Sequence, residues 1–145
     1  MIRTATLKDL ESIVEIEKTF GADAFTRRCL RHLISNQSTL VIDKNRILGY
    51  SIVLVRKNST KARLYSIAIA EPYRGNGYGQ ALLKASENLA ITLGCDRIGL
   101  EVAENNRVAQ GLYKAMGYKL LKTIENYYSD GTHAQRFLRT LQPHS

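Results

Sequence analysis

Residues 74–79, Arg-Gly-Asn-Gly-Tyr-Gly, place three glycines and an arginine between a strand-like segment (64–70) and a helix-like one (80–93). Glycine lets a backbone turn tightly and approach a ligand without a Cβ in the way. The first amides of a helix lack partners within it and lie at the positive end of its dipole. Two interpretations follow: an anion-binding loop with a charged arginine at its edge, or a turn that only connects two elements.

Two common phosphate-binding loops do not match this stretch. The P-loop ends in Gly-Lys-Ser/Thr, but Gly79 is followed by Gln80 and Ala81. The dinucleotide fingerprint G-x-G-x-x-G has a different spacing from the G-x-G-x-G of residues 75–79, and its acid closes the second strand. Here Asp96 precedes the next predicted strand instead. Both nucleotide-binding classes are therefore excluded.

The pattern that fits is Q/R-x-x-G-x-G/A, which is filled here by Arg74, Gly75, Asn76, Gly77, Tyr78 and Gly79. It resembles the pyrophosphate loop of the Gcn5-related N-acetyltransferases (GNAT), which bind acetyl-coenzyme A. Further matches follow in order and at the expected spacing: Leu-Glu-Val at 100–102, Asn106, Ala109, Leu-Tyr at 112–113 and Gly-Tyr at 117–118. This series is similar to the Rim-type (ribosomal-protein-alanine N-acetyltransferase-like) protein N-terminal acetyltransferases. The resemblance covers nearly the whole chain and is most specific over residues 64–128.

The resemblance implies acetyl-coenzyme A as cosubstrate and no metal. The loop 74–79 would hold the pyrophosphate, and the backbone groups of Ile67, Ala68 and Ile69 would pair with the pantetheine arm like an added strand. Asn106 would hold that arm, or it would cap the helix that follows, and the two roles are compatible because Asn is a good N-cap.

Composition agrees with a small enzyme. A chain of 145 residues with 44% hydrophobic content can bury one core, and we expect a single domain over residues 1–145. No apolar run approaches the roughly 20 residues that span a membrane, and no signal peptide is visible. Cys29 and Cys95 are far apart without metal-type spacing, which favours two reduced thiols and a cytoplasmic location.

The formal net charge of +8 favours polyanionic partners, including the phosphates of the coenzyme. Arg27, Arg28, Arg31 and His32 share one face of a predicted helix, either as a docking patch or as an ordinary solvated face. No aromatic residues are interleaved with basic ones as single-stranded nucleic acid requires, so we do not expect nucleic-acid binding. An exposed edge strand would allow a homodimer as well as a monomer.

Hydrophobic periodicity and turn residues predict a mixed α/β fold with helices on both faces of one sheet, the order of a GNAT domain. The expected elements are strand 2–5, helices 7–19 and 26–34, strands 39–43, 46–56 and 62–70, helix 77–93, strand 97–102, helix 107–116, and strands 118–127 and 134–141. Turns are expected at 43–46 and 129–132.

Acetyl transfer to an amine requires a base to take a proton from it, and an acid to protonate the departing thiolate. Glu101 is the candidate base. Side chains alternate along strand 97–102, so Glu101 points away from Leu100 and Val102, and a carboxylate inside a central strand is costly unless hydrated or paired. The residues alone leave two interpretations open, a base or a carboxylate paired with Lys or Arg. The resemblance favours a base acting through water. Glu104, the rival, falls in the following loop.

Tyr113 is the candidate acid, because the family places a tyrosine beside the coenzyme sulfur at this point. A phenol with a pKa near 10 stays protonated at neutral pH and can still give its proton to a thiolate. The alternative is an ordinary half-buried tyrosine that packs with Leu112 and Met116.

The acceptor groove of this superfamily implies roles for Phe25, between the first two helices, and for Tyr127 and Tyr128. The paired tyrosines resemble those with which protein N-terminal acetyltransferases grip a peptide backbone, although plain strand aromatics would look the same. Three functions are therefore considered: acetylation of a protein or peptide N-terminus, acetylation of a small amine or lysine side chain, and non-catalytic acyl-coenzyme binding.

Overall fold

The elements of the computed structural model, which describes residues 1–142, follow the predicted order closely. The α-helices are α1 (Leu10–Glu17), α2 (Arg27–Ser35), α3 (Tyr78–Thr92) and α4 (Arg107–Ala115), and short 3-10 turns are η1 (Leu7–Asp9), η2 (Lys18–Asp23) and η3 (Glu71–Tyr73). The strands are β1 (Ile2–Thr4), β2 (Thr39–Asp43), β3 (Ile47–Val55), β4 (Lys61–Ile69), β5 (Arg97–Ala103), β6 (Lys119–Ile124) and β7 (Ala134–Thr140). The mixed α/β class is confirmed.

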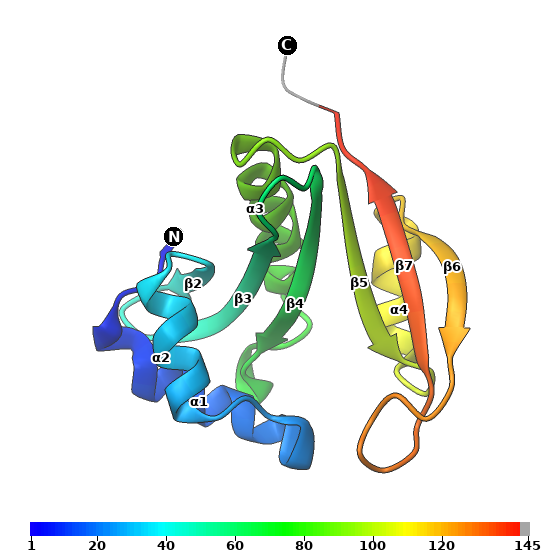
Figure 1. Cartoon of the computed structure of the whole chain (residues 1–145). Helices are drawn as coiled ribbons and strands as arrows, with labels where there is room; N and C mark the ends of the chain where they lie inside the picture. The colour runs from blue at the N-terminus through cyan, green and yellow to red at the C-terminus, as the bar shows by residue number, and fades with distance from the viewer. Residues whose placement is uncertain (143–145) are drawn as a thin grey trace. The chain divides into compact units, whose positions relative to one another are not determined.

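The chain divides into two compact units. Unit 1 contains residues 1–54 and 64–89, and unit 2 contains residues 55–63 and the chain from residue 90 onward. The hydrogen-bonded strand order is β1-β2-β3-β4 in unit 1 and β4-β5-β7-β6 in unit 2, to which β4 contributes Lys61–Arg63. The neighbours β1–β2, β2–β3, β5–β7 and β7–β6 are antiparallel (Figure 1).

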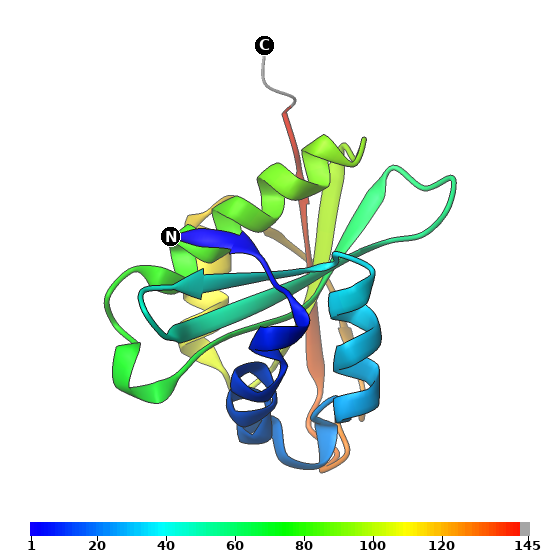
Figure 2. The same cartoon turned by 90° about the vertical axis from the view of Figure 1, so that its left-hand side faces the viewer.

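In unit 1 both faces of β2 are apolar, so helices cover both sides of the strands. Leu40 and Ile42 lie in one core with Leu82 of α3. Val41 points the opposite way and lies in a second core with Leu30 of α2. Figure 2 shows α1 and α2 on one side of these strands and α3 on the other. The expected helices on both faces are therefore present in this unit.

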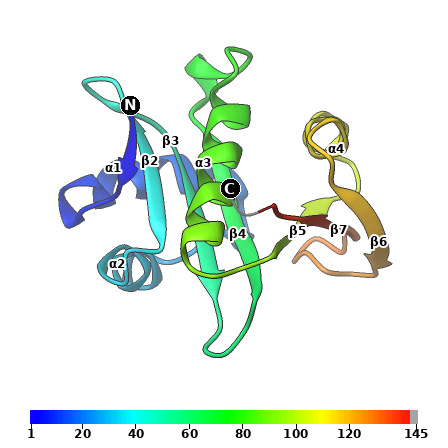
Figure 3. The same ribbon diagram turned by 90° about the horizontal axis from the view of Figure 1, so that it is seen from above.

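In unit 2 the apolar side chains of β5 and β7 form a core on one face of the sheet. Ile98, Leu100 and Phe137 are each no more than 1% exposed, and Leu100 lies opposite Phe137 in the register. Helix α4 lies on one side of these strands (Figure 3). The other face of β5 carries Gly99 and Glu101, because successive side chains alternate.

Two predicted elements differ from the structure. The strand expected at 118–127 ends at Ile124, because Asn126 has a positive φ of 53° that breaks the extended conformation, and Tyr127 therefore lies in a loop. The helix expected at 7–19 begins as η1 and ends at Glu17, and the chain continues as η2 through Gly21 at φ 59°.

The basic face of α2 is exposed, as its sequence suggested. Arg27, Arg28, Arg31 and His32 are all exposed, and Arg27 pairs with Glu11 of α1. Thr26 caps the helix by accepting from the amide of Cys29. Cys29 and Cys95 are free thiols.

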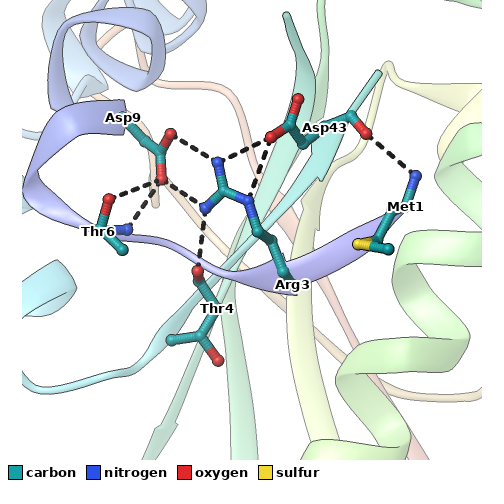
Figure 4. A network of polar contacts seen from close by, with 6 residues as sticks. All are labelled: Met1, Arg3, Thr4, Thr6, Asp9 and Asp43. Atoms are coloured by element: carbon teal, nitrogen blue, oxygen red, sulfur yellow. Dashed lines mark hydrogen bonds and ion pairs between the residues drawn. The ribbon is translucent and has the colours of Figure 1, made fainter. Parts of the chain in front are cut away.

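A charged network fastens β1 to β2 and to the first helical turn (Figure 4). Arg3 donates to Asp9 through both terminal nitrogens, at 2.8 and 3.0 Å, and to Asp43 at 3.0 Å. Asp9 also accepts from the amide of Thr6 at 2.8 Å. The hydrogen bonds from Arg3 hold the pKa of Asp9 below its ordinary value of 3.8.

Replacing Asp9 with Asn should lower the free energy of unfolding by about 2 kcal/mol at neutral pH, since hydrogen bonds to charged groups contribute on that scale. A lowered folded pKa means that the carboxylate stabilises the fold above pH 3.8 and loses this effect as pH falls through the folded pKa. The difference between the two proteins should therefore shrink in acid. Denaturant unfolding across pH tests this. Glu15→Gln, which removes an exposed pair with Lys18, is the control and should change little.

Candidate active site

The turn between β4 and α3 has the backbone that an anion-binding loop needs. Gly75 and Gly77 both have φ of +81°, a left-handed conformation that side chains with a Cβ rarely adopt. A Cβ built on either glycine would meet no atom within 4 Å, so the surface of the turn is open. The first bond of α3 runs from the amide of Ala81 to Gly77, and the preceding amides lie at the helix N-terminus. These residues fit a bound phosphate.

Two side chains of the loop hold its shape. Arg74 donates from Nε to the carbonyl of Ile69 at 2.9 Å, which leaves its terminal nitrogens for other partners. Asn76 donates from Nδ2 to the carbonyl of Tyr73 at 3.1 Å. The glycines thus provide the backbone conformation, while Arg74 and Asn76 fix the loop to the end of β4 and to η3.

Two cations that we did not single out from the sequence lie beside the loop. Lys44 stands over the ring of Tyr78, with Nζ 5.4 Å from its centroid, and Arg46 donates to the hydroxyl of Tyr73 at 2.9 Å. Both come from the turn between β2 and β3. Their signal in the sequence was the basic composition of that predicted turn, but only the fold shows which loop they adjoin.

The backbone segment Ile67–Ile69 lies in β4 as predicted, and its residues are half-buried. Strand β3 approaches it closely at Gly49, where an added Cβ would lie 2.7 Å from the carbonyl oxygen of Ala68. Gly49 is therefore required for the packing of β3 on this part of β4. Pairing of Ile67, Ala68 and Ile69 with a pantetheine arm remains a prediction.

Glu101 is flanked by arginines from both neighbouring strands. Its Oε1 lies 2.8 Å from Nη2 of Arg63, and its Oε2 lies 2.8 Å from Nε of Arg136, the residue directly opposite on β7. The carboxylate side chain is only 9% exposed. The paired interpretation of the sequence is thus observed. This pairing is compatible with the predicted role as base, which remains a prediction, because each carboxylate oxygen has two lone pairs and these contacts use one on each.

Tyr113 is buried on the inner face of α4 and is 6% exposed. Its ring packs against Tyr118 and Phe137, with centroids 5.7 and 6.3 Å away. Burial raises the pKa of its phenol well above the ordinary value. The hydroxyl therefore stays protonated at neutral pH, and the role of Tyr113 as the acid remains a prediction.

Asn106 caps α4, because its Oδ1 accepts from the amide of Ala109 at 3.2 Å. The side-chain nitrogen of Asn106, Nδ2, is a separate donor, so the cap is compatible with the predicted contact to a pantetheine arm. Gln110 reinforces this junction by donating to the carbonyls of Ala103 and Glu104, at 2.9 and 2.8 Å.

The loop between β6 and β7 holds the paired tyrosines. The rings of Tyr127 and Tyr128 meet edge to face, 4.9 Å apart and at 82°. The hydroxyl of Tyr127 accepts from Nη2 of Arg63 at 2.8 Å, and Tyr127 is 39% exposed. One side chain therefore connects the candidate base with a candidate acceptor-binding residue, a link that the sequence did not predict.

A cavity of about 380 Å³ lies where the loop after β5 meets the loop before β7. It is lined by Glu104, Asn105, Arg107, Gly131, Thr132 and His133. Glu104 is exposed, as expected for a loop residue. The amide of Asn126 donates to Nδ1 of His133 at 2.9 Å, which fastens the loop that carries the tyrosines.

In unit 1 Phe25 contacts Tyr65, with ring centroids 5.0 Å apart. Its amide donates at 2.7 Å to Glu17, a buried carboxylate that also accepts from the hydroxyl of Tyr50 and lies 3.5 Å from that of Ser66. Glu17 is 2% exposed, and it was missed by the sequence analysis. The sequence did indicate that Glu17 is buried, because Leu10, Ile13 and Glu17 share one face of α1.

Burial raises the pKa of Glu17 above its ordinary value of 4.5, despite its hydrogen-bond donors. The folded protein thus holds this proton more tightly than the unfolded chain does. The resulting stability is fully present below pH 4.5 and is lost as pH rises through the folded pKa. Glu17→Gln should remove this component, so the variant should gain stability relative to the native protein as pH rises across that window. Thermal unfolding across pH measures it. A difference that stays flat, or that resembles the one for exposed Glu15→Gln, would contradict the assignment.

Within residues 1–142 no helix is both long and apolar enough to cross a membrane, and no three His, Cys, Asp or Glu side chains are grouped as metal ligands.

Comparison with known proteins identifies the family. Residues 8–118 match the acetyltransferase (GNAT) family. The chain is 32% identical over 133 residues to a candidate ribosomal protein bS18-alanine N-acetyltransferase of Bacillus subtilis, covering 89% of this chain and 87% of the relative. It is 28% identical over 147 residues to an N-alpha-acetyltransferase of Sulfurisphaera tokodaii, covering 92% and 88%.

The fold agrees with this match. The crystal structure of Ard1 from Thermoplasma volcanium superposes with a TM-score of 0.88 at 28% identity, over 98% of this chain and 97% of the other. The predicted resemblance to the GNAT family is thereby confirmed over most of the chain. The protein belongs to the acetyltransferase (GNAT) family and is an acetyl-coenzyme A-dependent N-acetyltransferase.

Proposed function

We propose that the protein acetylates the N-terminal α-amine of a protein or peptide. The observation that carries this proposal is the arrangement in unit 2. There a carboxylate (Glu101) is joined through Arg63 to the exposed Tyr127, which packs on Tyr128. A base linked to a pair of tyrosines suits an acceptor whose backbone continues beyond the reacting amine. The relatives named as N-alpha- and ribosomal-protein-alanine acetyltransferases support the same acceptor class.

We further propose how the residues divide the chemistry. The amine must be neutral to attack the thioester carbonyl, and as the N–C bond forms Glu101 takes a proton from the amine nitrogen through a water molecule. The C–S bond breaks, and the sulfur leaves as a thiolate. Tyr113 gives its phenolic proton to this thiolate. A backbone amide of Ile67–Ile69 donates to the carbonyl oxygen, where negative charge develops.

The coenzyme would be held mainly by backbone. The amides that follow Gly77 and the guanidinium of Arg74 would receive the pyrophosphate, with Lys44 adding positive charge nearby. Asn106 would donate to the pantetheine arm.

We propose that both units belong to one N-acetyltransferase domain spanning residues 1–145, because the family match at 8–118 runs through both.

The direct test is acetyl transfer to matched peptides that differ only in a free or blocked N-terminus and that all contain an internal lysine, read by mass spectrometry. Label confined to free N-termini is expected. Label on lysine regardless of blocking would move the activity to side chains. Coenzyme binding with transfer to no peptide would contradict the proposal and direct the search to small amines.

Glu101→Gln and Tyr113→Phe should each lower kcat by about 10²- to 10⁴-fold, the usual contribution of a general base or acid. Coenzyme A affinity should be retained in both, because the proposed pyrophosphate loop is untouched. Calorimetric titration with coenzyme A and thermal unfolding show whether each variant is folded. Glu104→Gln is the matched control, an exposed glutamate near the end of the same strand, and should retain near-native kcat. Wild-type turnover in both Glu101→Gln and Tyr113→Phe would exclude this mechanism.

A further inference from the structure

We propose that Arg63 is a positioning residue that couples the base Glu101 to the acceptor contact Tyr127. The inference rests on the proposed function, since it takes from there the roles of these two residues. It adds a residue that neither the glycine loop nor the Leu-Glu-Val and Leu-Tyr motifs would identify.

The contacts of a single nitrogen carry the argument. Nη2 of Arg63 lies 2.8 Å from Oε1 of Glu101 and also donates at 2.8 Å to the hydroxyl oxygen of Tyr127. A guanidinium nitrogen of this kind has two N–H bonds, so it can serve both oxygens at once. The planar guanidinium therefore fixes the distance and direction between the carboxylate and the phenol.

The bond to Tyr127 also prepares that residue for a ligand. Because the phenol oxygen accepts from Arg63, its own hydrogen remains available to donate to a carbonyl of an acceptor. Hydrogen bonds in such a series polarise one another, so the charged guanidinium makes the phenol a better donor. Tyr127 is 39% exposed and can be reached from solvent, whereas the side chain of Glu101 is 9% exposed. An acceptor held by Tyr127 is thus connected to the base through one intervening side chain.

Arg136 supplies an internal control. It has the same charge as Arg63 and pairs with the same carboxylate at the same 2.8 Å, but it does so from β7 and through Oε2. Its side chain is similarly exposed, 32% against 41%. Loss of either arginine removes one ion pair from Glu101, but only loss of Arg63 also removes the bond to Tyr127.

The test is a pair of double-mutant cycles on peptide acetylation. One combines Arg63→Gln with Tyr127→Phe, and the other combines Arg136→Gln with Tyr127→Phe. Arg63→Gln should raise the KM for peptide and lower kcat, and adding Tyr127→Phe should then cost at least about threefold less than it does alone. In the Arg136 cycle the two effects should multiply to within about twofold.

Three further readouts separate positioning from general damage. The KM for acetyl-coenzyme A should stay near its native value in every variant. Thermal unfolding should show that the Arg63 and Arg136 single variants are folded. Arg63→Lys should restore part of kcat by keeping the charge, but it should leave the KM for peptide raised, since an ammonium lacks the planar geometry.

The outcomes distinguish the two proposals. If the native protein acetylates peptide N-termini and the Arg63 effects simply multiply, or if Arg136 couples equally to Tyr127, the positioning role of Arg63 is wrong while the function stands. If the native protein transfers acetyl to no peptide N-terminus, the proposed function is wrong and the role of Arg63 falls with it. Coupling confined to the Arg63 cycle supports both.

Discussion

A carboxylate in the middle of β5 must be compensated, and unit 2 is arranged around this constraint. The side chain of Glu101 is only 9% exposed, and Arg63 on one neighbouring strand and Arg136 on the other balance its charge. Unit 1 handles a buried carboxylate differently, because the identified donors to Glu17 are neutral amide and hydroxyl groups and burial raises its pKa. Two arginines thus compensate one carboxylate, while the other accepts from the amide of Phe25 and fastens that segment.

Much of the fold follows from the sequence, because local patterns decide it. Period-two alternation locates strands such as β5, and period-3.6 stripes locate α3 and α4 to within about two residues. The errors have local causes that the patterns do not encode. A single residue with positive φ, Asn126, ends β6 early and turns the predicted strand residue Tyr127 into a loop residue. The helix expected to run to residue 19 ends at Glu17, where the chain continues as the irregular 3-10 segment η2.

The candidate site was only partly predictable. Candidate residues in contiguous motifs, such as Gly75, Gly77 and Tyr113, could be proposed from the motifs and from the family resemblance that these motifs carry. The side chains that pair with a candidate residue could not be predicted, because strand register decides which side chains meet. A Lys or Arg partner of Glu101 was one of the two interpretations that the sequence left open, but 21 such residues are available, and only the pairing of β5 with its neighbours selects Arg63 and Arg136.

The guanidiniums of Arg63 and Arg136 and the carboxylate of Glu101 together carry one net positive charge. An acceptor arriving as an ammonium ion would be repelled by this charge, whereas the neutral amine would not. Since only the neutral amine can attack a thioester, the same arginines that make the carboxylate tolerable inside a sheet would, in the proposed function, also discriminate between the two protonation forms of the acceptor. In that function, folding and selection of the reactive form draw on one set of charges.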